Sequence, residues 1–335
     1  MSKRTLIIAE AGVNHNGSLD RAKEMIKVAS SCGADYIKFQ TFKAEEISTS
    51  TASKAPYQIE SSSSDQSQQA MLKNLELTES DYIEILDYCA KSSINCFSTA
   101  FDMGSLKFLE SVDQNLYKIP SGEITNLPYL EYIGSLRKEV ILSTGMSSMR
   151  DIERAFKILI DSGTTKDNIS ILHCTSQYPA SIDELNLTAM HSIKEEFGVR
   201  VGYSDHSEGI HIAIAAVSLG AVILEKHFTL DKDLAGPDHK ASIDPVELKN
   251  LIKAIRDVDL AMGDGKKYPM PGELMNLNVI RKSIVAKVLI KEGDIFNINN
   301  ITCKRPAEGI SPMEWHEVLG KRAKQNFEID DLIVI

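Results

Sequence analysis

The sequence of 335 residues has no apolar run approaching the ~20 residues that a membrane-spanning helix needs, so we expect no membrane partner. Its N-terminus, MSKRTLIIAEAG, carries a basic pair and a short apolar run. A secretory signal would need a longer apolar region followed by a small-residue cleavage site. We therefore expect a cytoplasmic protein in which Thr5–Ala9 belongs to a buried first strand.

Paired cysteines are also lacking. The five cysteines are scattered and no CxxC pair occurs, which argues against a disulfide framework and against a cysteine-rich zinc site. The formal charge of −10 argues against nucleic acid as a partner. An anionic small substrate would need a local cluster of lysine and arginine to overcome this acidic background.

A GxGxxG motif, which a doubly wound nucleotide-binding sheet would carry after its first strand, is missing as well. What the chain does contain is a regular alternation of β-branched runs with amphipathic segments. The candidate strands are Thr5–Gly12, Tyr36–Gln40, Asn95–Ala100, Leu116–Pro120, Glu139–Gly145, Ile169–Thr175, Arg200–His206 and Val222–Thr229. The candidate helices between them include Leu19–Ser31, Glu79–Lys91, Met149–Asp161 and Ile210–Leu219. This alternation favours an α/β fold in which parallel strands close into a (β/α)8 TIM barrel.

Two regions depart from the alternation. The polar connection from Thr41 to about Leu77 is longer than ordinary loops, and we interpret it as an excursion over the barrel mouth with a mobile tip. After a helix near Val246–Met262, the segment GDGKKYPMPGE is rich in Gly, Pro and Lys, which indicates a linker. We predict a barrel over 1–265, a linker over 266–282 and a small β-rich domain over 283–335.

Polar side chains lie at the ends of all eight candidate strands, where barrel enzymes carry their catalytic groups. Such a concentration of charge in one mouth would be costly without a function. Lys38 and Lys118 could hold a phosphate or carboxylate there, or could instead extend to the surface. Glu10 and Glu123 could transfer protons, or could simply pair with those lysines.

His206 and His227 end adjacent candidate strands, the seventh and the eighth. Imidazoles in such positions can converge on one divalent ion and leave other coordination positions open to substrate. No short ligand motif accompanies them, so two hydrogen-bonded barrel histidines are an equally good interpretation of the spacing alone.

Several ordered blocks of the sequence carry a resemblance to a known family. The blocks are IIAEAGVNHNGS, IKFQTFK, STAFD, KIPSGEITNLPYL, STGM, HCTSQYP, GYSDHS, EKHFTLDK, GPDHKAS and KRPAEGISPMEW. In these blocks the chain resembles the bacterial sialic acid synthases, which make N-acetylneuraminic, legionaminic and related nonulosonic acids. The resemblance implies that the β-rich tail is an antifreeze-like (SAF, β-clip) domain.

The resemblance also implies a role for individual residues. His206 and His227 match metal ligands, usually for manganese, with magnesium or cobalt as alternatives. Glu10, Glu123 and Lys118 match catalytic positions, although we assign Lys118 to anion binding. The positions that match substrate-binding residues are Lys38, Gln40, Thr99, Ser121, Ser143, Ser176, Tyr178, Ser204, Asp238 and Arg305. Arg305 is expected to reach the barrel of the partner chain in a domain-swapped homodimer.

The reaction that the resemblance implies joins phosphoenolpyruvate to an amino-sugar aldehyde. Carbon 3 of phosphoenolpyruvate attacks the metal-polarised aldehyde, water adds at carbon 2, and phosphate leaves. We expect N-acetylmannosamine as the sugar and N-acetylneuraminate as the product. The alternative is 2,4-diacetamido-2,4,6-trideoxymannose, which would yield N,N'-diacetyllegionaminate. More distant alternatives are a Schiff-base pyruvate aldolase and a sugar-binding protein without activity.

Overall fold

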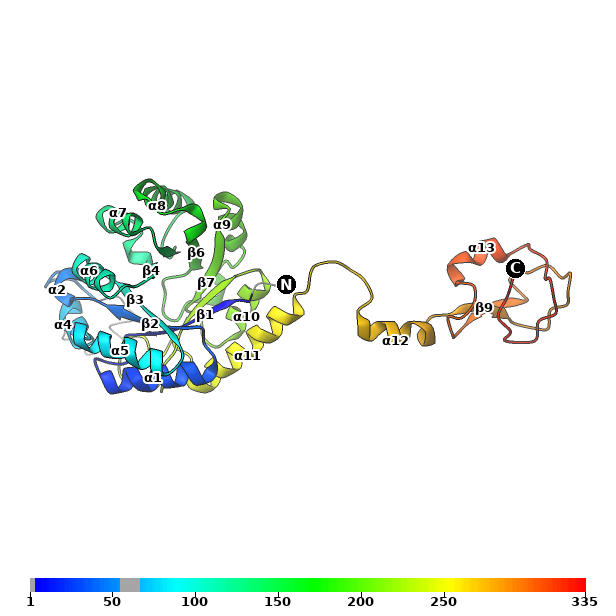
Figure 1. Cartoon of the computed structure of the whole chain (residues 1–335), viewed down its shortest axis with the longest axis horizontal. Coiled ribbons are helices and arrows are strands. Elements are labelled where there is room, and N and C mark those ends of the chain that lie inside the picture. The colour runs from blue at the N-terminus through cyan, green and yellow to red at the C-terminus, as the bar shows by residue number, and fades with distance from the viewer. Residues whose placement is uncertain (1–3, 55–66) are drawn as a thin grey trace. The chain divides into compact units, whose positions relative to one another are not determined.

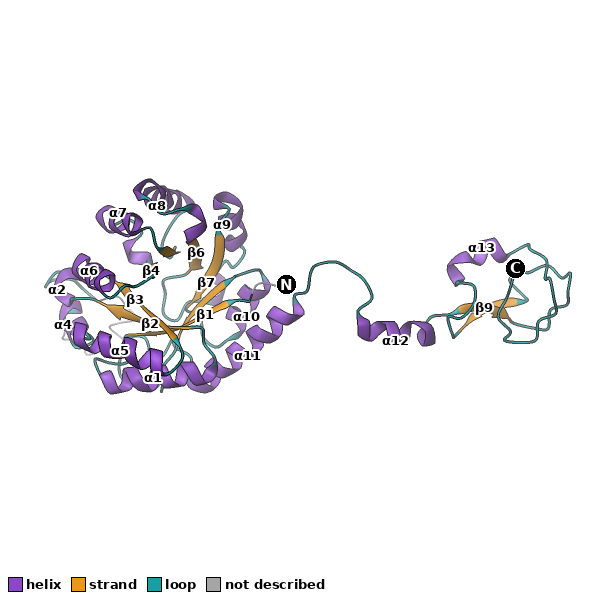
Figure 2. Cartoon of the chain, in the orientation of Figure 1, coloured by secondary structure: helices purple, strands orange, loops and turns teal. Residues whose placement is uncertain are grey.

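The structure is a computed structural model that describes residues 4–54 and 67–335. The chain divides into two compact units, Met1–Asp264 and Gly265–Ile335. The first unit alternates strands with helices, and the second contains two short strands and short helices (Figures 1 and 2).

All eight predicted strands of the first unit are present, each within two residues of its predicted ends. They are β1 (Leu6–Gly12), β2 (Tyr36–Thr41), β3 (Asn95–Ala100), β4 (Leu116–Ile119), β5 (Glu139–Ser143), β6 (Ile169–Cys174), β7 (Arg200–Asp205) and β8 (Ile223–His227). The strands are parallel in the order β3-β2-β1-β8-β7-β6-β5-β4. Since β3 and β4 at the two ends of this order also lie next to each other, the sheet closes, and the predicted barrel is confirmed.

An outer ring of helices covers the strands (Figure 2). The longer helices are α1 (Leu19–Cys32), α5 (Glu79–Lys91), α6 (Met103–Ser111), α7 (Leu127–Leu136), α8 (Met149–Ser162), α9 (Ala189–Phe197), α10 (His211–Ser218) and α11 (Pro245–Ala261). Capping boxes at Thr78, Ser148 and Asp244 start α5, α8 and α11, because each side chain accepts a bond from the backbone three residues on. Within the described residues, no helix has both the length and the apolar character needed to cross a membrane.

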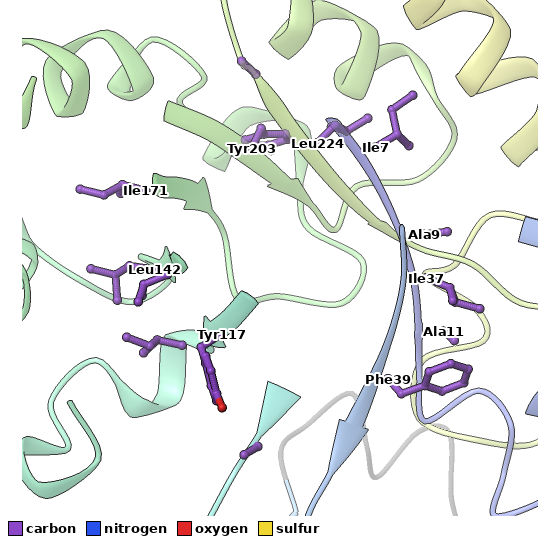
Figure 3. Packing of buried hydrophobic residues seen from close by; sticks show 14 of the residues in the cluster. Ile7, Ala9, Ala11, Ile37, Phe39, Tyr117, Leu142, Ile171, Tyr203 and Leu224 are labelled. Atoms are coloured by element: carbon purple, nitrogen blue, oxygen red, sulfur yellow. The ribbon is translucent and has the colours of Figure 1, made fainter. Parts of the chain in front are cut away.

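Two apolar layers form the barrel core, because side chains along a strand alternate between its faces. The larger layer lies between strands and helices, and it includes Ile7, Ala9 and Ala11 of β1 (Figure 3). The smaller layer fills the barrel interior and consists of Ile8, Phe97, Ile141, Leu172 and Ile223. Apolar side chains therefore fill this part of the barrel interior.

Gly202 of β7 lies where this interior layer leaves no room for a side chain. An added Cβ would come within 2.3 Å of the carbonyl oxygen of Ile223 and 2.5 Å of Leu172 Cδ2. We expect Gly202→Ala to lower the free energy of unfolding by about 3 kcal/mol, since such overpacking moves backbone. Gly122→Ala, which meets open space, should change it by less than about 0.5 kcal/mol. Urea denaturation of both variants measures this, and equal midpoints would contradict the packing described.

The described residues of the connection from Thr41 to Leu77 include two short helices that the sequence did not predict, α2 (Ala44–Ile47) and α4 (Gln68–Lys73). Its two arms are joined, since Ser48 Oγ donates to Gln68 Oε1 at 3.0 Å and Gln69 Nε2 donates to the Ser48 carbonyl at 2.8 Å. The predicted mobile tip lies in 55–66, outside the described residues.

The second unit has its own apolar core. Its elements are α12 (Pro271–Ile280), β9 (Ser283–Ala286), the antiparallel β10 (Ile301–Lys304) and α13 (Trp315–Val318). Ile284, Phe296, Val318 and Phe327 are among the buried side chains of that core. The segment 266–282, which the sequence indicates as a linker, contains the helix α12, a difference from the prediction.

Candidate active site

The inward-facing side chains change from apolar to polar along each strand. On β1 the interior residue Ile8 is followed two residues later by Glu10, and on β5 Ile141 is followed by Ser143. On β8 the inward positions run from Ile223 to Glu225 and His227. This two-residue step places a polar layer directly above the apolar interior, at the carboxyl ends of the strands.

These side chains line a cavity of about 310 Å³, here called the mouth cavity. The predicted site residues that line it are Glu10, Lys38, Gln40, Thr99, Lys118, Ser121, Ser143, Ser176, Tyr178, Ser204, His206 and His227. A second hollow of about 280 Å³, the outer cavity, shares Gln40, Phe101, Tyr178 and His227 with the first. Glu123 and Asp238, the other predicted barrel residues, line the outer cavity.

Arg305 belongs to the second compact unit. There its Nε donates to the carbonyl oxygen of Ile280 at 2.8 Å. Its expected reach into the barrel of a partner chain stays a prediction.

Two lysines and two carboxylates form a buried network on the floor of the mouth cavity. Lys118 Nζ lies 2.7 and 2.8 Å from the two carboxylate oxygens of Glu225, and Ser204 Oγ donates to Glu225 at 2.9 Å. Lys38 Nζ lies 2.7 Å from Glu10 Oε2 and 3.7 Å from Glu225 Oε2, and it donates to Thr99 Oγ1 at 3.0 Å. All four charged groups are almost completely buried, so removing the charge of one of them changes the electrostatic energy of the others.

The buried network shifts the pKa of each carboxylate in a different direction. Burial raises the pKa of Glu10 to about 7, against the opposing effect of Lys38. Burial would also raise the pKa of Glu225, but Lys118 and Lys38 hold it well below its usual range. Glu225 is therefore a fixed negative charge between the lysines, whereas Glu10 can gain or lose a proton near neutral pH.

The pKa values of the two lysines are also shifted in opposite directions. Burial lowers the pKa of Lys118 by more than Glu225 raises it. Burial also acts against the charge on Lys38, but Glu10 and Glu225 together raise the pKa of Lys38. The two lysine charges are opposed by the fixed charge of Glu225 and by Glu10 when it is ionised. The network is therefore positive only when Glu10 carries a proton, the state that favours an anion in the mouth.

His206 and His227 lie next to each other at the ends of the adjacent strands β7 and β8, with ring centroids 5.5 Å apart. His206 Nδ1 donates to the Thr175 carbonyl at 2.7 Å, which leaves a lone pair on Nε2 in the neutral ring. His227 Nδ1 is buried without a hydrogen-bond partner, with Asp238 Oδ2 at 3.8 Å. Burial lowers the pKa of His206 to about 4, and it also lowers the pKa of His227.

Neutral imidazoles with one oriented ring and one unpartnered nitrogen fit a divalent metal ion. In the described part of the chain, no group of three or more His, Cys, Asp or Glu side chains is arranged to hold a metal. An ion bound by His206 and His227 would therefore need substrate or water oxygens as further ligands.

Glu225 is the site residue that the sequence analysis did not select. Glu225 lies two residues before His227 on the same strand, so the two side chains share the inward face. This two-residue spacing was the sequence pattern that could have identified Glu225 as a site residue. The intervening residue Lys226 points the other way, and its Nζ lies 2.7 Å from Asp205 Oδ2 in a buried pair outside the cavity. His173, a polar residue near the end of β6, does not line the mouth cavity, and its Nε2 donates to the Leu185 carbonyl at 2.7 Å.

The fold and site together define a class: a (β/α)8-barrel protein whose mouth contains two buried lysines and a pair of neutral histidines. Comparison with known proteins supports this class. The NeuB family matches residues 25–267, and the SAF domain matches residues 281–334. The chain therefore belongs to the NeuB family and carries a SAF domain.

Named relatives agree with this assignment. The chain is 52% identical to an N,N'-diacetyllegionaminic acid synthase of Campylobacter jejuni over 99% of both chains. It is 42% identical to an N,N'-diacetyllegionaminic acid synthase of Legionella pneumophila over 97% of this chain and 92% of that one. The crystal structure of an N-acetylneuraminic acid synthetase from Leptospira borgpetersenii in complex with citrate is 33% identical, with a TM-score of 0.71 over 82% of this chain and 90% of that one. The chain is accordingly an enzyme, and it belongs with the nonulosonic acid synthases.

Proposed function

We propose that this enzyme is an N,N'-diacetyllegionaminate synthase. It condenses phosphoenolpyruvate with 2,4-diacetamido-2,4,6-trideoxymannose and water, and it releases phosphate. The observation that carries the proposal is the 52% identity, over 99% of both chains, to a synthase named for this product.

The comparisons favour the alternative sugar over N-acetylmannosamine, the first expectation. Both synthases named for N,N'-diacetyllegionaminic acid are more similar to this chain, at 52% and 42%, than the N-acetylneuraminic acid synthetase at 33%. The motifs that carry the resemblance identify the family and leave the sugar open.

Phosphoenolpyruvate would occupy the mouth cavity. Lys38 and Lys118 offset its charge, and the hydroxyls of Thr99, Ser121, Ser143 and Ser176 line the same space as possible donors. The hydroxyl of Ser204 also lines it but donates to Glu225. Glu225 holds both lysines in position, because its oxygens contact Lys118 Nζ and lie near Lys38 Nζ. Preorganised charge in a buried site stabilises the anionic transition state without a cost of reorganisation during the reaction.

The sugar aldehyde would lie beside the histidine pair. A divalent ion at His206 and His227, manganese by the family resemblance with magnesium or cobalt as alternatives, supplies Lewis-acid polarisation of the aldehyde oxygen when bound. Glu10, with its pKa near 7, is suited to hold or release a proton in the mouth cavity. Glu123 in the outer cavity, where Asn126 Nδ2 donates to it at 2.6 Å, is the second candidate for proton transfer.

The proposal includes a domain-swapped homodimer in which Arg305 of one chain completes the anion site of the other. Its support is the family resemblance around Arg305 and the SAF match over residues 281–334.

Phosphate release with each sugar in turn tests the proposed function. With phosphoenolpyruvate and manganese saturating, we expect kcat/KM for the diacetamido sugar to exceed that for N-acetylmannosamine by roughly 100-fold or more, because polar and apolar contacts both differ. A higher kcat/KM with N-acetylmannosamine would show that the proposed substrate is wrong.

A further inference from the structure

The outer cavity has an apolar wall that none of the assigned site residues explains. Eight of its lining side chains are apolar: Val13, Phe42, Ile47, Met71, Leu72, Leu75, Phe101 and Pro237. Most of them come from the two arms of the Thr41–Leu77 connection. The polar residues of this cavity include Gln40, Tyr178 and His227, which it shares with the mouth cavity. The outer cavity therefore combines polar residues that continue into the mouth with a group of apolar side chains from the two arms, next to which Gln68 of α4 also lines the cavity.

The wall is held in place by packing within the described residues. Val13, Phe42 and Leu75 form a small buried cluster with Leu72 and Phe101 against it. The rings of Phe42 and Phe101 meet edge to face, with centroids 6.3 Å apart. The chain after α4 also lies close to the β1–α1 loop, because a Cβ added to Gly17 would be 2.6 Å from the Asn74 carbonyl oxygen. These contacts make the wall a fixed surface to which a ligand must conform.

The position of the wall fixes which part of a sugar could touch it. Carbon 1, the aldehyde, must meet carbon 3 of a phosphoenolpyruvate held by Lys38 and Lys118 in the mouth cavity. An open-chain sugar placed in this way extends its other end through the shared residues into the outer cavity. Carbons 4 to 6 would then lie against the apolar wall.

The two candidate sugars differ at that end. N-acetylmannosamine carries hydroxyls at carbons 4 and 6, whereas the diacetamido sugar carries an acetamido group at carbon 4 and a methyl group as carbon 6. A hydroxyl pressed against Met71 and Leu72 would lose water without gaining a partner. A methyl group or an acetyl methyl would instead bury apolar surface there.

We propose that the wall formed by Phe42, Met71, Leu72 and Leu75 is the specificity-determining surface that selects an amino-sugar with methyl groups at its distal end. This inference rests on the proposed function, since it assigns part of the outer cavity to the sugar of that reaction. It gives the described arms of the connection between β2 and α5 a role in substrate choice.

The test replaces Leu72, a half-buried residue of α4 that lines the cavity, by glutamine of similar length. We expect kcat/KM for the diacetamido sugar relative to N-acetylmannosamine to fall by about 10-fold or more, chiefly through the KM of the diacetamido sugar. Leu72→Met, which keeps an apolar side chain of similar volume, should keep the wild-type ratio within twofold of its value. Ala70→Gln, at an exposed position of the same helix, should also keep it.

The wild-type ratio and its change separate the two ideas. A wild-type preference for N-acetylmannosamine contradicts the proposed function. An unchanged ratio in folded Leu72→Gln overturns the role of the wall, whatever the wild-type preference is. If Leu72→Gln fails to fold, Leu72→Ser and Met71→Gln are measured in the same way, and an unchanged ratio in the folded variant is equally decisive.

Discussion

Lys118→Met is expected to lower kcat/KM for phosphoenolpyruvate by about 100- to 1,000-fold, the usual effect of removing one preorganised group that stabilises an anionic transition state. The Lys118 ammonium lies within 2.8 Å of both oxygens of Glu225 and lines the mouth cavity. Its loss removes one of two local cations and leaves Glu225 with Ser204 and the more distant Lys38. Steady-state phosphate release at saturating sugar measures the effect.

A loss of this size could also come from a general weakening of the barrel, and Lys226→Met is the matched control. Lys226 forms an equally buried pair with Asp205 and also bonds the Ser207 carbonyl, but it does not line either cavity. Breaking either buried pair should destabilise the fold by about 3–5 kcal/mol. Only Lys118→Met should lose activity per folded molecule. Equal losses in both variants would contradict the assignment of Lys118 to the anion site.

The second large effect is expected at the histidine pair. Replacing both His206 and His227 by asparagine should raise the Kd for Mn²⁺ by at least about 100-fold. Even residues that only hydrogen-bond a metal ligand commonly contribute 10- to 100-fold to metal affinity. Direct titration of the protein with Mn²⁺, followed by the signal of free Mn²⁺, gives this Kd without any need for turnover. Chelation should abolish phosphate release by the wild type, and added Mn²⁺ should restore it.

His191→Asn is the control for the histidine pair, because His191 is exposed and bonds only the Leu219 carbonyl among the described residues. Its Mn²⁺ affinity should equal that of the wild type. Tight Mn²⁺ binding that survives in the double variant would place the metal elsewhere.

The barrel could be predicted from the sequence because each strand is a short β-branched run bounded by amphipathic helices. The alternation of apolar runs with amphipathic segments is a local pattern, so it can be recognised without knowledge of the tertiary structure. The sequence analysis did not assign the face on which each polar strand-end residue lies. Glu225 and Lys226 are adjacent and both charged, but only Glu225 lines the mouth. A shift of one residue along the strand is therefore enough to change a residue of the site, such as Glu225, into a member of a buried ion pair, such as Lys226.

The helices of the Thr41–Leu77 connection and α12 were missed for a different reason. The helix α4 has six residues and packs against α2 and the apolar cluster of Val13, Phe42 and Leu75, contacts that no local pattern reveals. Within the second compact unit, none of the side chains of α12 is buried, and Met275 is 82% exposed. Such a helix lacks the apolar stripe that identifies a surface helix in a sequence.

The choice of sugar could not be predicted because most of the residues proposed to determine it lie outside the motifs. The strand ends carry the residues proposed to act on phosphoenolpyruvate and the aldehyde. Of the proposed wall, Phe42 lies within the motif IKFQTFK, but Met71, Leu72 and Leu75 belong to none of the motifs that carry the family resemblance.

A competition between the two sugars tests the central claim most directly. The enzyme is given equal concentrations of N-acetylmannosamine and 2,4-diacetamido-2,4,6-trideoxymannose, with manganese and a limiting amount of phosphoenolpyruvate, and the products are separated by mass. The product ratio equals the ratio of the two kcat/KM values at equal sugar concentrations. We predict that N,N'-diacetyllegionaminate accounts for nearly all of the product. A mixture dominated by N-acetylneuraminate would contradict the account.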